Sequence, residues 1–500
     1  MTRWRGATDI MTPGGLSDSA QSLAQRSLEA ARRAADGWAA RSVRQRLRVI
    51  ARLRRRLGDE PLDLARTADL PWRSSAAETL TAEVLPLLDA CRFLERQAAS
   101  LLAPRRPGRR GRPAWLFGSA LEVRREPHGV VLVIAPSNYP ILLAGVQLLQ
   151  ALVAGNAVLV KPGRGGLPAM QALADDLAAS GLPPEVLQVL PESVEVAEAV
   201  LAEGVDKVVL TGSRQTGLRV LEQLAPTATP AVMELSGCDA AVVMNGADLA
   251  QAARAIAFAM TLNGGFTCIA PRRLLVAEEV STELAAELAR QLDLRPPPRL
   301  PAATRQALDQ AVAEAVSQGA VLVAGRRPST QGCHPVVLAN VAEELADRLA
   351  EIPAPAAALL PIRDPEEALA RVAAGALRLG VSVFGPPKAA RALARRMDTG
   401  VAVVNDLIVP TADPRAPFGG RGASGFGTTR GPEGLLEMTV IKTLIERRGR
   451  WRPHYDPVDD RDAPLFQSFV QLLHGSGLRQ RLAALRRLAV AGRQRQRRER

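Results

Sequence analysis

Short apolar runs alternate with helical segments between residues 129 and 211, and this rhythm restricts the fold more than any other feature. The apolar runs cover residues 130–135, 157–160, 186–190 and 207–210, and helical segments such as 142–154, 197–202 and one ending near Ala179 separate them. Short strands without polar interruption, separated by helices, are typical of a parallel sheet that is covered on both faces. The sequence therefore predicts an α/β protein with a doubly wound sheet.

Polar residues follow several of these strands directly. Asn138 comes after the first strand, Lys161 ends the second, and the turn Thr211-Gly212-Ser213 follows 207–210. In open parallel sheets, ligands bind beyond the carboxyl ends of the strands. We therefore expect Asn138, Lys161 and this turn to lie together at a ligand site.

A second α/β unit starts near Ala240, and 500 residues are enough for two or three domains. It contains a helix at 250–260, a Gly-rich turn at 263–273, a strand at 273–277 and a helix that ends near residue 294. Before the first unit, residues 17–57 predict two helices and residues 78–101 a third. A Pro/Gly/Arg-rich connector follows at 103–113.

The Gly-rich turn carries Cys268, one of four cysteines, and the spacing of the four fits no zinc site. A thiol on such a turn can be a nucleophile, although a lone cysteine is more often a small buried apolar residue. Acyl chemistry on a thiolate also needs an oxyanion donor and a base that activates water. Asn138 is a candidate for the oxyanion donor and Glu234 for the base. Asn138 could instead only form a turn, and Glu234 could be an ordinary surface carboxylate.

Free cysteines, no signal-peptide core and no apolar run of about 18 residues predict a cytoplasmic protein. The net charge is +13, and residues 447–500 hold 14 Arg against 5 acids, a net of 14 − 5 = +9. No nucleic-acid-binding motif accompanies this excess, so we expect no nucleic acid partner. Leu478, Leu482, Leu485 and Leu488 form a stripe flanked by arginines. Residues 465–500 could therefore lie on anionic lipid or pack on the protein itself.

Several short motifs, taken in order, resemble those of the aldehyde dehydrogenase superfamily over roughly residues 15–445. They are Pro136-Ser-Asn-Tyr-Pro140, Lys161-Pro162, Leu210-Thr-Gly-Ser-Arg-Gln-Thr-Gly217, Glu234-Leu-Ser-Gly237, Cys268 itself, Glu351-Ile-Pro-Ala-Pro355 and Pro417-Phe-Gly-Gly420 followed by Ser424-Gly425. Cys268 follows Glu234 by 34 residues, the spacing usual for the family. The short region before Asn138 resembles the class 3-like branch, which includes fatty-aldehyde enzymes.

The resemblance implies the fold and its division. A Rossmann-like cofactor domain would cover 1–104 and 126–236, and an α/β catalytic domain 237–430. A β-arm for oligomerisation would cover 105–125 and 431–446, with a basic C-terminal tail at 447–500. Pairing of the arm with a strand near 438–444 would give a homodimer or homotetramer.

The resemblance also implies a reaction, the oxidation of an aldehyde to the carboxylic acid with NAD or NADP. Cys268 would form a thiohemiacetal and then a thioester, Asn138 would stabilise the oxyanion, and Glu234 would activate water. The cofactor would lie on residues that belong to these motifs, namely Lys161, Arg164, Gly212, Ser213, Gly217 and Glu351. No metal is implied.

Departures from the family pattern refine this hypothesis. Phe266 replaces a usual Gln, which favours an apolar aldehyde, long-chain or aromatic. Arg164 stands where the family often has a Glu that would repel a 2′-phosphate. An arginine there favours use of NADP, alone or beside NAD, and the alternative is that Arg164 only points to solvent. Phe266 and the altered motif at Glu351 also keep open the alternative of a catalytically weak binding or structural protein, against which the intact Asn138, Glu234 and Cys268 argue. A semialdehyde dehydrogenase or an acyl-CoA-type reductase is another, although Glu234 argues against the reductase.

Overall fold

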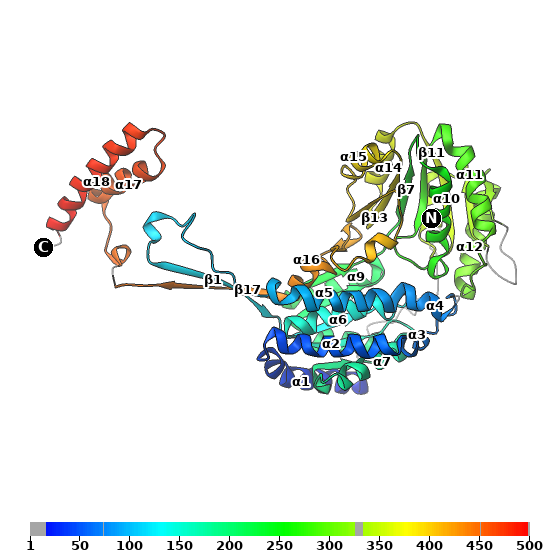
Figure 1. Cartoon of the computed structure of the whole chain (residues 1–500), viewed down its shortest axis with the longest axis horizontal. Coiled ribbons are helices and arrows are strands. Elements are labelled where there is room, and N and C mark those ends of the chain that lie inside the picture. Colours follow the sequence, from blue (N-terminus) through cyan, green and yellow to red (C-terminus); the bar gives the residue numbers. More distant parts are fainter. Residues whose placement is uncertain (1–16, 74, 326–333, 451, 499–500) are drawn as a thin grey trace. The chain divides into compact units, whose positions relative to one another are not determined.

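The computed structural model describes residues 17–73, 75–325, 334–450 and 452–498 (Figure 1). Cys333 and the first 16 residues of the expected cofactor domain lie outside these ranges, as do residues 451, 499 and 500 of the tail. The contacts divide the chain into two compact units. The larger comprises 1–105 and 123–443, and the smaller 106–122 and 444–500.

The first sheet of the larger unit has six strands in the order β16-β6-β5-β2-β3-β4. Their bounds are β2 Val130–Ile134, β3 Ala157–Lys161, β4 Leu187–Val189, β5 Lys207–Thr211, β6 Ala231–Glu234 and β16 Gly425–Phe426. All pairs are parallel except β16 with β6. The predicted doubly wound sheet is therefore confirmed. The antiparallel edge strand, however, comes from the late Gly-rich segment that we assigned to the catalytic domain.

Helices connect and cover these strands, and strands β2, β3 and β5 are buried along their whole length. The connecting helices are α6 Leu142–Ala154, α7 Leu167–Ala179, α8 Val194–Glu203 and α9 Arg214–Leu224. The N-terminal region adds α1 Asp18–Ala39, α2 Val43–Asp59, α3 Pro61–Thr67, α4 Ala76–Thr79 and α5 Leu85–Leu101. A π-helical turn, Leu80–Val84, joins α4 to α5. The third helix predicted from the sequence is therefore continuous but contains a π-bulge.

The second sheet has seven strands in the order β14-β13-β7-β8-β11-β10-β9. They are β7 Asp239–Val243, β8 Pro271–Ala277, β9 Val321–Ala324, β10 Val336–Ala339, β11 Ala356–Ile362, β13 Gly380–Phe384 and β14 Val401–Val404. The helices of this half are α10 Leu249–Thr261, α11 Glu278–Asp293, α12 Ala302–Ser317, α13 Glu343–Ala350, α14 Pro365–Ala374 and α15 Pro387–Ala394. Short strands β12 Leu377–Arg378 and β15 Arg421–Gly422 pair with each other. The second α/β unit predicted from Ala240 is confirmed.

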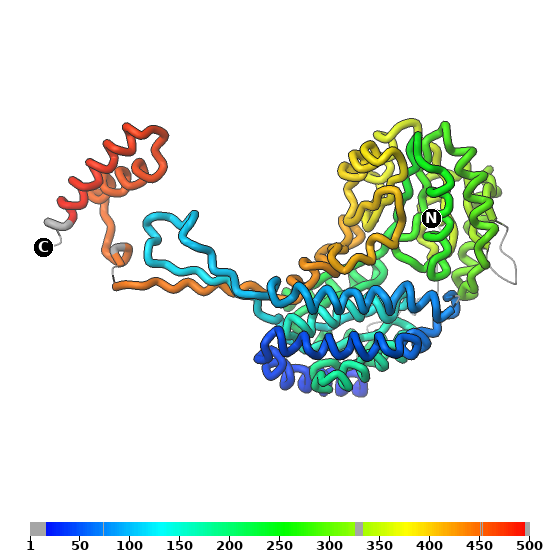
Figure 2. Tube along the Cα trace, in the orientation of Figure 1, coloured from blue at the N-terminus to red at the C-terminus, as the bar shows by residue number. Residues whose placement is uncertain are grey.

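The expected arm consists of β1 Ser119–Pro127 and β17 Thr439–Arg447, which form a two-stranded sheet (Figure 2). Helix α16, Gly431–Glu437, packs on α5 and α6 instead, so the arm strand begins at Thr439. In the smaller unit, α17 Ala463–His474 and α18 Leu478–Arg498 pack against each other. No helix among the described residues is long and apolar enough to cross a bilayer.

Candidate active site

The candidate polar groups of the first sheet meet at one edge, as the strand order predicts. Ile134 is in register with Lys161, and Thr211 with Glu234, so four neighbouring strands end at nearly the same level. The turn that holds Asn138 begins just after Ile134. The edge therefore brings together the predicted oxyanion donor, the predicted base and a lysine.

Cys268 lies in a tight turn between α10 and β8. Asn263 and Gly265 take left-handed backbone angles there, with φ of 52° and 82°. A Cβ atom on Gly265 would lie 2.5 Å from the backbone nitrogen of Pro355, so only glycine fits without displacement. The guanidinium of Arg272 fixes the same contact, because it donates to the carbonyl oxygens of Gly265 and Ala354.

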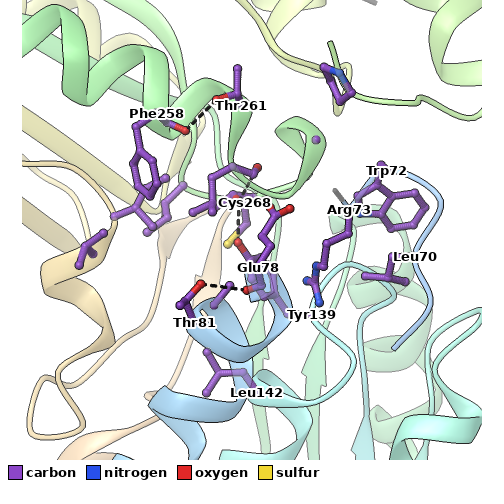
Figure 3. A pocket seen from close by; sticks show the side chains of 18 of the residues that line it. Leu70, Trp72, Arg73, Glu78, Thr81, Tyr139, Leu142, Phe258, Thr261 and Cys268 are labelled. Atoms are coloured by element: carbon purple, nitrogen blue, oxygen red, sulfur yellow. Dashed lines mark hydrogen bonds between the residues drawn. The ribbon is translucent and has the colours of Figure 1, made fainter. Parts of the chain in front are cut away.

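The Cys268 turn faces a cavity of about 930 Å3 (Figure 3). Cys268 is part-buried and lines the cavity together with a majority of apolar side chains, among them Leu70, Trp72, Tyr139, Leu142, Leu143, Phe258, Ile269, Val409 and Phe418. Arg295, Arg299 and Arg430 also line it. The cavity can therefore enclose a mainly apolar molecule with one end at the Cys268 sulfur.

Asn138 is tied to the Cys268 turn. Its side-chain Nδ2 donates to the backbone carbonyl oxygen of Phe266 at 2.7 Å, and its backbone carbonyl oxygen accepts from Asn263 Nδ2 at 2.8 Å. One N–H of the amide is thus held by the backbone two residues before the sulfur, and a second N–H remains for a ligand. The structure brings Asn138 to Cys268, although Asn138 itself does not line the large cavity.

A buried ion pair supports both turns, and its arginine, Arg73, also lines the cavity. Asn263 Oδ1 accepts from Trp72 Nε1 at 3.1 Å and from Arg73 Nε and Nη2 at 3.2 and 3.1 Å. Arg73 Nη1 pairs with Glu83, and the two side chains are 2% and 0% exposed. The Trp72 ring stacks on Phe266 with centroids 4.2 Å apart.

Glu83 in turn fixes the start of α6. Its Oε2 accepts from the backbone nitrogens of Ile141 and Leu142 at 2.7 and 2.9 Å. N–H groups at the start of a helix have no acceptor within the helix, so the Glu83 carboxylate satisfies both of them. Burial raises the pKa of Glu83, while Arg73 and these two N–H groups act in the opposite direction. The Asn138 turn, which leads into α6, is therefore held from both its ends.

Glu234, at the end of β6, is 2% exposed. Its Oε2 accepts from the hydroxyls of Thr429 and Thr211 at 3.3 and 3.5 Å, and Oε1 has no partner among the described residues. Burial raises the pKa of Glu234, with Arg430 lowering it in part. A carboxyl of this kind can exchange a proton nearer neutral pH than an exposed one, which suits a general base.

Arg430 links the thiol and the carboxyl electrostatically. Burial raises the pKa of Cys268 to about 12, the negative charges of Glu234 and Asp239 add to this, and Arg430 opposes it. The Arg430 side chain is held by a hydrogen bond from Nη1 to the Thr411 carbonyl at 2.8 Å and lies over the Phe418 ring. Its backbone, at φ 61° and ψ 173°, is in a region that residues other than glycine rarely adopt.

The predicted cofactor residues at the first sheet include two cationic side chains and a turn whose backbone a ligand can approach. Lys161 is 9% exposed, and burial lowers its pKa, with Glu192 acting in the opposite direction. Glu192 accepts from the backbone nitrogens of Gly165 and Leu167, both at 2.9 Å, beside the exposed Arg164. A Cβ on Gly212 would touch only Leu210, at 3.7 Å, so the approach to this turn is open. A lysine, an arginine and a helix start together suit a dinucleotide.

The other predicted cofactor residues differ among themselves. Ser213 caps α9 by accepting from Thr216 N at 3.1 Å. A Cβ on Gly217 would lie 2.6 Å from Leu235, so this glycine allows α9 to pack closely on the sheet. Glu351 is exposed at the end of α13, although its segment reaches the Cys268 turn through Pro355. The structure therefore gathers Lys161, Gly212 and Ser213 at one edge and leaves the Glu351 carboxylate in solvent.

Sequence reasoning missed the residues that support the site. Arg73, Glu83 and Arg430 lie outside every motif that we recognised. Only the Asn263-Gly264-Gly265 run before Cys268 gave a local signal, since Asn and Gly are the residues that tolerate left-handed angles.

Comparison with known proteins decides the family. The profile of the Aldehyde dehydrogenase family matches residues 12–444. The chain belongs to this family. The predictions of the fold and of an NAD- or NADP-dependent aldehyde dehydrogenase are thereby confirmed at the level of the family, while the class 3-like branch is not.

Two relatives and one solved structure show which kinds of protein the chain is similar to. A 4,4'-diapolycopene aldehyde oxidase of Methylomonas sp is 30% identical over 471 residues, 91% of this chain and 88% of the relative. A putative NADP(+) succinate-semialdehyde dehydrogenase of Mycobacterium ulcerans is 30% identical and covers 84% of this chain and 83% of its own. The crystal structure of a Mycobacterium tuberculosis aldehyde dehydrogenase complexed with NAD+ has a TM-score of 0.78 at 27% identity. It covers 85% of this chain and 90% of that one.

Proposed function

We propose that the protein oxidises an apolar aldehyde, long-chain or aromatic, to the carboxylic acid through a thioester on Cys268. The observation that carries this proposal is the large, mainly apolar cavity with the Cys268 sulfur in its wall. The relative named as a 4,4'-diapolycopene aldehyde oxidase supports it. Phe266, stacked on Trp72, adds an aromatic wall beside the nucleophile.

The residues of the chain would act as follows. The Cys268 thiol loses its proton to solvent, and the thiolate attacks the aldehyde carbon while the carbonyl π electrons move to oxygen, forming the anion of a thiohemiacetal. The free N–H of the Asn138 amide stabilises the oxyanion, and Arg430 favours the charged thiolate. A nicotinamide cofactor held on the residues named below would supply the acceptor for the hydride that the adduct loses when it becomes the thioester. Glu234 then takes a proton from the water that attacks the thioester, which releases the acid and the Cys268 sulfur.

The cofactor would lie at the edge of the first sheet, on Lys161, Gly212 and Ser213, with Gly217 setting the position of α9. Arg164 would attract a 2′-phosphate, whereas the neighbouring Glu192 carboxylate suits a ribose hydroxyl. We therefore propose use of NADP+ as well as NAD+. The role predicted for Glu351 requires its exposed side chain to reorient when the cofactor binds.

Cofactor choice is tested by KM for both cofactors in the wild type and in Arg164→Glu. Arg55→Glu, an exposed arginine on α2, makes the same charge change away from the site. We expect only Arg164→Glu to raise KM for NADP+ and to leave KM for NAD+ nearly constant. An unchanged preference would refute the assignment of Arg164.

A semialdehyde substrate is the second candidate, because arginines line the same cavity. The Arg295 guanidinium lies 5.9 Å from the centre of the Phe258 ring and could pair with a distal carboxylate. The Mycobacterium ulcerans relative is named for such a substrate. If this candidate is right, Arg295→Met should raise KM for succinate semialdehyde and leave KM for decanal unchanged.

The main proposal is tested by following reduced nicotinamide with both cofactors across short, aromatic and long-chain aldehydes. We expect the highest kcat/KM for the apolar aldehydes and no turnover in Cys268→Ala. Cys91→Ala serves as control, because Cys91 is a free, fully buried thiol on α5 outside the cavity. Absence of turnover across the panel in a folded protein that also fails to bind either cofactor would favour the binding-protein alternative.

The cysteines and the exposed face of β17 bear on the cellular compartment and on the oligomeric state of the enzyme. The described cysteines Cys91, Cys238 and Cys268 are free, and the reaction needs a reduced thiol, so we place the enzyme in the cytoplasm. Apolar side chains on β17 are 41–67% exposed, namely Val440, Ile441, Leu444 and Ile445. We propose that this strand joins subunits into a homodimer or homotetramer.

A further inference from the structure

The hairpin of α17 and α18 lies beyond the matched family region and has no part in the proposed reaction. Residues 463–498 contain eight arginines and no aspartate or glutamate. The two helices pack on each other. Each contributes a buried residue, Ser468 at 4% and Ala484 at 0% exposure, and Arg487 donates to Gln471 across the pair at 2.7 Å. The hairpin therefore has its own small packed interface.

One face of α18 presents leucines that this packing leaves uncovered. Leu478, Leu482 and Leu485 are 75%, 52% and 50% exposed. Their spacing of four and three residues places them on one side of the helix. An exposed apolar stripe of this length is costly in water and marks a surface that is covered in use.

Arginines border this stripe. Arg479 and Arg486, one heptad apart, are exposed, and none of the ion pairs among the described residues involves either of them. Of the acids just before the hairpin, Asp462 pairs with Arg495 and Asp459 with Arg461, so neither pairs with the arginines that border the stripe. The face thus combines uncovered leucines with uncompensated positive charge, and its complement is an apolar surface that carries negative charge.

We propose that the leucine face of α18, formed by Leu478, Leu482 and Leu485 with Arg479 and Arg486, docks on the surface of an anionic phospholipid bilayer. Leucine side chains enter the boundary of the acyl chains while the guanidinium groups remain among the phosphates. Attachment is peripheral, because none of the described helices can span a bilayer. Docking would hold the enzyme where apolar aldehydes concentrate, a benefit that rests on the proposed substrate class, whereas the docking itself does not.

The test is co-sedimentation of the full-length protein with vesicles of phosphatidylcholine alone or mixed with phosphatidylglycerol. We expect binding to the anionic vesicles only, weakened by salt. The double variant Leu482→Ser/Leu485→Ser should bind roughly tenfold more weakly, because two leucine side chains no longer enter the lipid. Leu62→Ser, at a leucine on α3 that is 41% exposed, should bind like the wild type.

Three results would overturn the proposal. The first is equal sedimentation of the wild type and the double variant. The second is a double variant with a smaller assembly in size-exclusion chromatography, which would make the face a contact between copies of the chain. The third is binding to a DNA duplex that depends on Arg479 and Arg486 but not on the leucines. None of these measurements needs turnover, so they separate this proposal from the proposed reaction.

Discussion

Replacing Arg73 with methionine should destabilise the protein and slow the reaction together. The Arg73 and Glu83 side chains are 2% and 0% exposed, so the variant leaves a carboxylate buried without its cation. Removal of one member of a buried ion pair costs about 3–5 kcal/mol. Asn263 Oδ1 also loses two of its three donors, and the Asn138 carbonyl loses a further one at 3.3 Å. We therefore expect kcat to fall as well, because Asn138 is less well held.

The destabilisation should depend on pH, and its sign follows from Glu83. Burial already raises the pKa of Glu83, and loss of Arg73 removes its strongest opposing influence, so this pKa rises further. A carboxyl whose folded-state pKa is raised favours folding below its unfolded pKa and loses that contribution as the pH rises through the folded value. The variant should therefore be least stable at alkaline pH and recover part of its stability in mild acid.

The measurement is urea unfolding of the wild type and variant at mildly acidic and mildly alkaline pH. Arg396→Met is the matched control, because Arg396 and Glu366 form an ion pair whose side chains are 56% and 66% exposed. Solvent screens that exposed pair, so its loss should change the free energy of unfolding far less than the loss of Arg73. The reasoning fails if both variants lose the same stability, or if the loss in Arg73→Met does not change with pH.

Three further predictions concern the turn and the two reacting groups. Gly265→Ala should lower kcat and should destabilise the protein by roughly 1–3 kcal/mol more than the control Gly111→Ala. Both glycines have φ near 80°, but only at Gly265 does backbone lie within 2.6 Å of the new Cβ. Equal urea midpoints for the two variants would contradict this. Arg430→Gln should raise the pKa of Cys268, so the rate of its alkylation by iodoacetamide should rise only at higher pH than in the wild type; superimposable profiles would remove Arg430 from the site. Glu234→Gln should leave the burst of reduced nicotinamide intact and slow the steady state, abolishing the rise of kcat with pH that deprotonation of Glu234 causes; loss of the burst would argue for an earlier role.

The sequence alone determined the two α/β units and the position of the edge where the site lies. Apolar runs of strand length separated by helices leave a parallel sheet as the arrangement that covers both faces. Because parallel strands end at the same edge, residues that follow them meet whatever the length of the connections. This reasoning placed Asn138, Lys161 and the turn Thr211-Gly212-Ser213 together. The motif resemblance added Glu234 and the roles of these residues, which stay predictions.

Only the tertiary structure showed what holds these residues in place. Arg73 reaches Asn263 across 190 residues of chain, and Glu83 caps a helix that begins 59 residues later. Periodicity reports which face of a segment is buried, but not which distant polar group will meet it there. Likewise, a stripe of leucines on α18 predicts an amphipathic helix, whereas its exposure depends on which side α17 covers. Long-range polar partners and uncovered faces are set by packing, and packing is a property of the folded chain as a whole.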